Sequence, residues 1–466
     1  MTPRIESALR ETLAREAYGV PVPEDPWPGF ARRQGARRRA RRVRVAVVAA
    51  ILAAAVGIQT NLIPLPGWVP AVPVSGVWST WDEEPPRGAL SADRAWLAGL
   101  RRQVADVEDP EGVWRVLDRD AIRIVYADDV GPHRLALLLV PLRLGVVTVS
   151  ELFWYHGPAG AAADQMTQSS SSDSDSPVAS WMQVDAATGG VAVVVAPVGS
   201  TVTIGSGVDY RPSGTLARRQ VVVSQASGIG VASIAPTPVD PGITAEVTTS
   251  DGDLIHHGVS GSWSGATGTV DPQAPTEAMM TTVRSDFAGP APDRDILRAF
   301  VGWALRDSRL TVRDVSVRLR WWGTVNGQAA ALLTVRPEGG GVLAYAFHGT
   351  SRSMRLDLRL LLPADGADER PLAWRLRAEG RDDATDRVLV VAPPATAAVS
   401  LTPDGAAAMA VRLDAFGFGE ATLPPQAAAT VIARAGDGSL STTPVPPLES
   451  NLSGPPGDTP ATRIVP

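Results

Sequence analysis

The sequence predicts a single transmembrane helix followed by a β-rich body made of two diverged tandem copies, each with one N-terminal helix. Three observations support this fold class. An uncharged apolar run follows a block of arginines near the N-terminus, and short segments recur in the same order along the body. Alternating apolar strands, separated by Gly, Pro and Asp turns, make up most of each copy and favour an α+β or β-sandwich-like domain.

The composition is typical of a folded protein. Of 466 residues, 44% are hydrophobic and 20% are charged, and this length suits two or three domains. Cysteine is absent, which excludes a disulfide framework and a thiolate metal site. Residues 1–44 hold 11 arginines and five acidic residues, so this basic head precedes a strongly acidic body. An acidic body argues against nucleic acid as a partner.

The segment 43–63 is expected to cross the membrane as a helix. Val45 to Ile63 would extend roughly 28 Å at helical rise, about the thickness of one bilayer core. Arginines flank only the N-terminal side of the run, at Arg37, Arg38, Arg39, Arg41, Arg42 and Arg44. By the positive-inside rule, residues 1–42 are cytoplasmic and the body is extracytoplasmic, at the cell membrane. A cleaved signal peptide is the alternative, which the 44 residues before the run disfavour.

Two shorter regions flank this segment. Residues 4–17 predict a short amphipathic helix, because Ile5, Leu9 and Leu13 recur every four residues. Such a helix could dock a cytoplasmic protein or rest on membrane lipid, and an isolated helix of this length is barely stable by itself. Residues 64–90 are rich in Pro, Gly and Trp and are expected to form a stalk.

The body repeats itself in six matched segments. RAWLAGL (94–100) corresponds to RAFVGWAL (298–305), both at helical spacing. The other pairs are the hairpins 122–140 and 315–335, FWYHG (153–157) and YAFHG (345–349), VVVAP (193–197) and LVVAPP (389–394), SGIGVASIAP (227–236) and FGFGEATLPP (416–425), and TSDGDLI (249–255) and AGDGSLS (435–441). Their constant order predicts copies at 91–257 and 292–440, joined by a linker at 258–291. A proline-rich tail at 441–466 is expected to be disordered.

The sequence contains no catalytic, cofactor-binding or metal-ligating constellation. His156 and His348 are the two weak candidates, because each follows an aromatic strand and precedes a glycine in matched segments. They could form a paired ligand or proton-exchanging site. The favoured interpretation is a strand-end histidine bonded to a turn, since neither has a carboxylate at motif spacing. The neighbours His256 and His257 would point to opposite faces of a strand, so one metal ion could not easily bind both.

The layout of residues 1–66 carries a resemblance. An Ala/Arg/Glu helix, the linker EDPWPGF (24–30), an arginine block and an Ala/Val span follow one another. This layout resembles that of uncharacterised single-span envelope proteins of high-GC actinobacteria, and the resemblance implies no activity. Some membrane regulators that hold sigma factors share it, although the His/Cys zinc motif that some of them carry is missing here.

These observations predict a non-enzymatic single-pass membrane protein without a cofactor. Its extracytoplasmic β-rich domains would bind a cell-wall component or an envelope protein, or serve envelope structure. A transmembrane signalling regulator is the first alternative, with residues 4–17 binding a partner such as a sigma factor. An extracytoplasmic hydrolase is the second alternative, and it requires His156 or His348 to lie beside a carboxylate in a cleft.

Overall fold

The computed structural model describes residues 72–73, 81–105, 115–116, 118–144, 147–265, 270–378, 383–449, 454–458 and 462–464. The chain divides into two compact units, of which the smaller comprises residues 1–77, 104–121 and 141–149. In that unit, β1 (Val72–Pro73) pairs in parallel with Val147 and Thr148, and β2 (Arg115–Val116) pairs with Leu142 and Arg143. The larger unit carries most of the N-terminal half of the body (residues 81–265) and all of the C-terminal half (residues 270–464).

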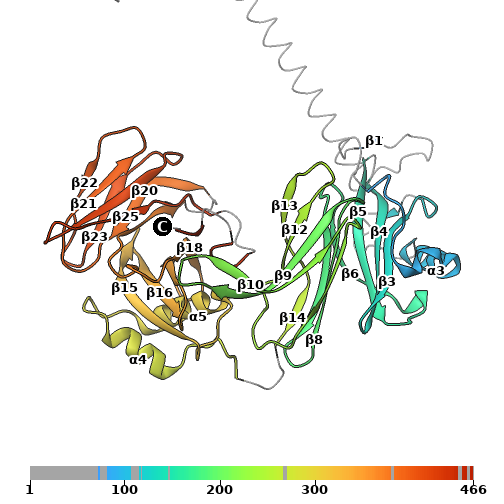
Figure 1. Ribbon diagram of the computed structural model, residues 1–466, viewed down its shortest axis with the longest axis horizontal. Helices are drawn as coiled ribbons and strands as arrows, with labels where there is room; N and C mark the ends of the chain where they lie inside the picture. The colour runs from blue at the N-terminus through green and yellow to red at the C-terminus, as the bar shows by residue number, and fades with distance from the viewer. Residues whose placement is uncertain are drawn as a thin grey trace, which may run out of the picture. The chain divides into compact units, whose positions relative to one another are not determined.

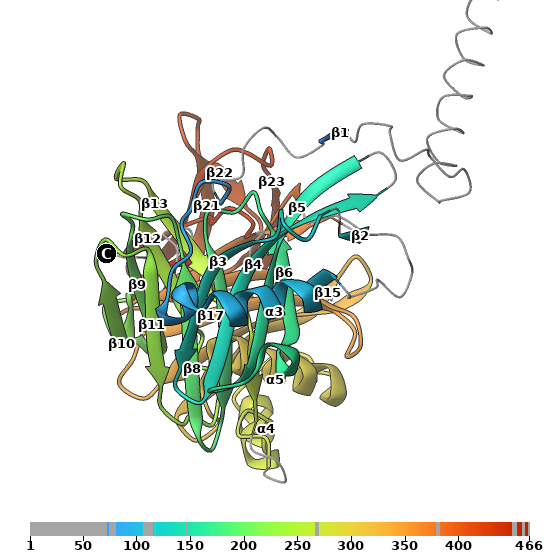
Figure 2. The same ribbon diagram turned by 90° about the vertical axis from the view of Figure 1, so that its right-hand side faces the viewer.

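The N-terminal half opens with a helix and a four-stranded meander. The short 3-10 helix η1 (Ala89–Ala92) leads into α3 (Arg94–Ala105). The meander consists of β3 (Arg123–Val130), β4 (His133–Leu144), β5 (Val147–Pro158) and, after η2 (Ala163–Gln165), β6 (Thr167–Asp173). Figures 1 and 2 show α3 lying across one face of this sheet, where its apolar positions Trp96, Leu97, Leu100 and Val104 are buried.

Two further sheets complete the N-terminal half. One has the order β11-β8-β7-β14 and contains β7 (Ala179–Asp185), β8 (Gly189–Val195), β11 (Ile229–Ile234) and β14 (Ser262–Ser264). The other has the order β10-β9-β12-β13 and contains β9 (Thr201–Tyr210), β10 (Leu216–Ser224), β12 (Thr244–Thr248) and β13 (Leu254–Gly258). Val194, Ile204 and Val247 belong to the apolar core between these two sheets.

The C-terminal half starts with two helices, α4 (Glu277–Ser285) and α5 (Arg294–Ser308). Its meander consists of β15 (Val315–Val325), β16 (Gln328–Pro337), β17 (Val342–Gly349) and β18 (Met354–Leu362). A three-stranded sheet of order β19-β20-β23 contains β19 (Leu372–Arg377), β20 (Ala384–Val391) and β23 (Phe418–Thr422). A last sheet of order β22-β21-β24-β25 contains β21 (Thr396–Pro403), β22 (Met409–Val411), β24 (Ala429–Ala435) and β25 (Leu440–Pro444).

The strands of the two halves are connected in the same way. The meander β3–β6 corresponds to β15–β18, the order β11-β8-β7 to β23-β20-β19, and β10-β9-β12-β13 to β22-β21-β24-β25. Even a β-bulge recurs, between Ile124 and Tyr126 in β3 and between Leu319 and Trp321 in β15. The six matched sequence segments fall on corresponding elements. A tandem duplication would produce this connectivity, and it stays a prediction together with its domain bounds.

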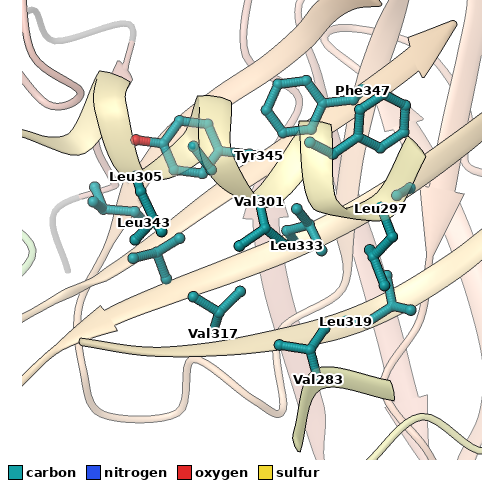
Figure 3. Close-up of a cluster of buried hydrophobic side chains, with 14 of the residues drawn as sticks. Val283, Leu297, Val301, Leu305, Val317, Leu319, Leu333, Leu343, Tyr345 and Phe347 are labelled. Atoms are coloured by element: carbon teal, nitrogen blue, oxygen red, sulfur yellow. The ribbon is translucent and has the colours of Figure 1, made fainter. Parts of the chain in front are cut away.

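Alternating strand residues build the layers of the C-terminal half. In β16, Leu333 packs toward α5, while its neighbour Leu332 packs toward β19 and β20. Figure 3 shows Val301 and Leu305 of α5 over the apolar side chains of the meander. The result is a helix and three stacked sheets, with a further core between the last two sheets. The same four layers are visible in the N-terminal half in Figure 1.

The predicted fold class needs correction. The body is β-rich, but no helix in the described ranges is long and apolar enough to cross a membrane. The predicted span 43–63 and its flanking arginines lie outside those ranges. The prediction also lacks helix α4, which lies before α5 in the predicted linker 258–291. Met280 and Val283 of α4 are buried in the same apolar core as α5. Two buried apolar residues in an otherwise polar helix give only a weak sequence signal for that helix.

Three connecting segments also differ from the expectation. The predicted linker 258–291 contains β14, whose Trp263 pairs in parallel with Val184 of β7, as well as α4. The predicted disordered tail contains the end of β25, and its Arg463 forms a bridge with Leu361. Trp81 of the predicted stalk is fully buried. In each case a few isolated side chains find a place in a core formed by distant strands, so no periodic pattern marks them.

Candidate functional site

A cleft of about 730 Å³ opens in the C-terminal half. We call it the C-terminal cleft. Its walls come from the segment before α5, from β15, from the β18–β19 connection and from the β20–β21 and β22–β23 connections, with Asp286–Gly289, Arg318–Arg320, Asp368, Ala392–Val399, Val411 and Leu413–Gly417 as the lining residues. The lining mixes apolar surface with two arginines and three aspartates. This combination of a concave surface with a few charged groups is typical of a binding site.

Three guanidinium groups share one carboxylate at this cleft. Arg318 Nη1 lies 3.1 Å from Asp368 Oδ2, Arg320 Nη1 lies 3.3 Å from Oδ1, and Arg336 Nη2 lies 3.3 Å from Oδ2. Arg320 also donates from Nη2 to the main-chain oxygen of Asp368 at 2.9 Å. Burial lowers the pKa of Arg320, and Asp368 opposes that shift. The cluster holds three guanidinium groups against one carboxylate, so it can accept a further anionic group.

The exposed rim of the cleft is held in place by short local contacts. The Asp414 carboxylate accepts from the N–H groups of Phe416 at 2.8 Å and Phe418 at 2.9 Å, which fixes the β22–β23 connection. Phe418 stacks on Trp321 with ring centroids 4.3 Å apart, while the side chain of Phe416 is 50% exposed. In the opposite connection, Ala395 adopts a φ of 66°, a conformation that costs about 1–3 kcal/mol for a residue other than glycine. The β22–β23 connection thus presents the aromatic ring of Phe416 at the rim.

His348 has the carboxylate partner that the hydrolase alternative requires, but it does not line this cleft. Its Nδ1 lies 2.6 Å from Asp357 Oδ2, and the two side chains are only 4% and 2% exposed. Asp357 also accepts from the N–H of Arg377 at 3.0 Å. The pair bridges β17 and β18 inside the sheet, so a substrate could not reach it from solvent.

His156 lies at the corresponding position on β5 and has different neighbours. Its Nδ1 is 3.5 Å from Thr167 Oγ1, and its ring lies 6.0 Å from that of Trp181. His133 contacts the same Trp181 ring at 5.3 Å, and burial lowers its pKa, with His156 adding to the shift. The two weak candidates therefore lie in different sheets, each with its own partners.

The adjacent histidines of β13 are also separated. His256 Nδ1 lies 3.6 Å from Glu246 Oε1 at the surface, whereas His257 Nε2 lies 2.9 Å from the buried Ser180 Oγ. Within the described part of the chain, no group of three or more His, Cys, Asp or Glu residues could hold a metal ion.

Sequence reasoning missed the cleft residues. Arg318 and Arg320 alternate with apolar residues along β15, which indicates only a strand with one polar face. Asp368 lies about 50 residues later in a turn, and nothing in the local pattern joins it to them. The one usable signal was the proline pair 393–394 after a matched strand, which marks a rigid connection.

Comparisons with known proteins add little to this geometry. No family model matches the chain, and no curated protein matches it. Among solved structures, it is similar to a "Biofilm associated protein - BSP domain" at 8% identity, covering 65% of this chain and 75% of that one with a TM-score of 0.16. The resemblance of residues 1–66 to actinobacterial envelope proteins stays a prediction.

Proposed function

We propose that this chain is a non-enzymatic binding protein and that the C-terminal cleft is its ligand site. The observation that carries the proposal is the cleft itself, in which a cluster of three arginines with one aspartate adjoins an exposed aromatic ring. An envelope component, either a wall polymer or a protein, is the ligand class that fits the sequence-based expectation.

The two alternatives have less support. The hydrolase alternative depends on an accessible histidine–carboxylate pair, and the His348–Asp357 pair is buried. The regulator alternative depends on residues 4–17, which lie outside the described residues, as do the arginines and the span that predict the location at the cell membrane. Both the regulator alternative and the location stay predictions.

Co-sedimentation with cell-envelope fragments tests the proposal. The full chain is expected to sediment with fragments from cells that lack it, and Arg318→Glu is expected to reduce the bound fraction about tenfold, as for the loss of one charged contact. Arg294→Glu is the matched control. Arg294 also pairs with one carboxylate, and its side chain is 58% exposed against 55% for Arg318. Equal binding of both variants, or no binding of the unaltered chain, contradicts the proposal.

A further inference from the structure

The N-terminal half has a counterpart of the C-terminal cleft that the chain fills with its own residues. Residues Trp81–Gly88, which we call the strap, lie along the edge of β3. The N–H of Arg87 donates to Val125 O at 3.1 Å, and the N–H of Ala127 donates to Arg87 O at 2.9 Å. This pairing is parallel. The strap thus adds to the meander as a short extended segment, a common mode of peptide recognition.

The side chain of Arg87 ties the strap to two loops. Its Nη1 donates to Ala196 O in the β8–β9 connection at 2.8 Å and to Ser227 O in the β10–β11 connection at 3.0 Å. The Glu84 carboxylate lies 3.4 Å from Arg87 Nη2 and accepts from the N–H of Val198 at 3.2 Å. One arginine and one carboxylate therefore bind two carbonyl groups and one N–H group of these loops.

An aromatic side chain anchors the start of the strap. Trp81 is fully buried among apolar residues of the facing sheets, and its Nε1 donates to Ser176 O at 2.7 Å. Arg123 of β3 donates from Nη2 to the main-chain oxygen of Glu84 at 2.8 Å. The strap is therefore recognised through an aromatic ring, an acid and an arginine in that order along the chain.

The two loops recur in the C-terminal half with the same main-chain contact. The N–H of Ala196 donates to Gly228 O at 2.7 Å, and the N–H of Ala392 donates to Gly417 O at 2.8 Å. This register makes Ala392 O and Phe416 O the counterparts of the two carbonyl groups that bind Arg87. Both residues line the C-terminal cleft.

The strand edge recurs as well. The shared β-bulge aligns Arg123 with Arg318 and Val125 with Arg320. β15 is the edge strand of its sheet, as β3 is at the strap. Arg320 O and the N–H of Trp322 thus correspond to the main-chain groups that pair with Arg87.

The two halves differ in the chain segment that lies at this strand edge. The segment before α5, residues 286–292, reads DFAGPAP and has no tryptophan, glutamate or arginine. Pro394 takes the place of Val198 and has no N–H to donate to a carboxylate. On the strand edge, Arg320 takes the place of Val125. An acidic group of a ligand would therefore meet the guanidinium groups of Arg318 and Arg320, where Glu84 of the strap meets the N–H of Val198.

We propose that the C-terminal cleft binds an extended segment of a partner protein, parallel to β15, with an acidic residue followed two to four positions later by an arginine. The guanidinium of that arginine donates to Ala392 O and Phe416 O, and the acidic side chain lies against Arg318 and Arg320. This inference rests on the proposed function of the cleft and names its ligand as a peptide. The strap of the same chain is the structural template for the ligand.

The test uses a fluorescently labelled peptide of residues 81–90, WDEEPPRGAL, and the full chain. In the N-terminal half, the strap already occupies the edge of β3. Binding of the peptide therefore reports on the C-terminal cleft. Fluorescence anisotropy should show saturable binding at one site. A peptide with Arg87→Gln should bind at least about tenfold more weakly, as expected for the loss of a charged donor to two carbonyl groups. This comparison does not depend on any variant of the chain folding.

Variants of the chain locate the peptide. Ala397→Trp places an indole at an exposed cleft position and should weaken binding at least about tenfold. Ala428→Trp, at an exposed position that does not line the cleft, should bind as the unaltered chain does. Absence of binding, equal binding of the two peptides, or equal binding to Ala397→Trp overturns the inference.

Two outcomes separate this inference from the proposed function. Protease treatment of the envelope fragments should abolish co-sedimentation if the ligand is a protein segment. If treated fragments still bind in an Arg318-dependent way, the cleft binds a non-protein component, and the inference fails while the proposed function stands. If the full chain self-associates and Ala397→Trp abolishes this, the occupant is a second copy of the chain, and the assignment to a partner protein fails.

Discussion

Two histidines, the buried His348 and the half-buried His257, form hydrogen bonds between distant parts of the chain. His348 and Asp357 fix two neighbouring strands to each other, and Arg377 fixes the same carboxylate to β19. His257 binds the hydroxyl of Ser180, which also accepts from the N–H of Ser260. These contacts join residues that are 9 to 80 positions apart in the sequence.

The pH dependence of stability should contain a contribution from His257. Burial lowers the pKa of this ring in the folded chain, so the unfolded chain takes up its proton first as the pH falls. The stabilising contribution is therefore complete above about pH 6.5 and is lost as the pH falls through the lower folded pKa. In urea unfolding at pH 7.5 and pH 5.0, His257→Gln should lose less stability on acidification than the unaltered chain.

His256→Gln is the control for that measurement. Its side chain is 66% exposed, and it lies next to His257 on the same strand. The same loss of stability on acidification in His257→Gln and the unaltered chain would show that burial of His257 does not contribute.

At the scale of elements, turn chemistry sets the hairpins. The two-residue turn between β15 and β16 places Asn326 at a φ of 51° and Gly327 at 75°. These angles suit the right-handed twist of a hairpin, and Asn-Gly is the pair that adopts them most readily. The turn fixes the register of β15 on β16, and β15 carries the arginines of the cleft.

Gly327→Ala should therefore destabilise the chain by about 1 kcal/mol. The added Cβ would meet no atom within 4 Å, so the cost comes from backbone strain alone. Gly436→Ala is the matched control, because that Cβ also meets nothing within 4 Å and its φ is not positive. Thermal unfolding of both variants measures the difference, and equal midpoints would contradict the strain argument.

At the scale of the whole molecule, a buried ionic cluster joins three distant positions, Asp307, Arg359 and Glu449. Arg359 of β18 pairs with Asp307 of α5 at 2.9 Å and binds Glu449 through two nitrogens, at 2.9 and 2.7 Å. The Arg359 side chain is 2% exposed. Burial raises the pKa of Asp307 and of Glu449, and Arg359 opposes both shifts. A guanidinium at this depth needs carboxylate partners.

Glu449→Ala should lower the free energy of unfolding by about 3 kcal/mol, because it removes one carboxylate from a buried guanidinium. Glu420→Ala removes a carboxylate that binds Arg387 through both oxygens at the surface and should cost less than about 1 kcal/mol. Urea unfolding of the two variants compares a buried pair with an exposed one. Similar costs would mean that water screens the Arg359 cluster.

Local pattern explains which parts of this protein could be predicted from the sequence. Alternating apolar residues and Asn-Gly or Asp-Gly turns depend on neighbours a few residues apart, so the sequence predicts the β-rich body, the hairpins and the matched segments. It also excludes cysteine chemistry. Helix α4, strand β14 and the packing of Trp81 and Ile464 were not predicted, because single apolar side chains within polar segments carry no period.

The sequence by itself determined that the body is β-rich and where two of its hairpins lie, at 122–140 and 315–335. Only the tertiary structure decided where chemistry is possible. It buried the His348–Asp357 pair, and it brought Arg318, Asp368 and Phe416 to one open cleft. In the N-terminal half, it brought Arg87 to the main-chain oxygens of Ala196 and Ser227. The physical reason is that a site depends on contacts between residues tens of positions apart, which sheet stacking creates and no local pattern records.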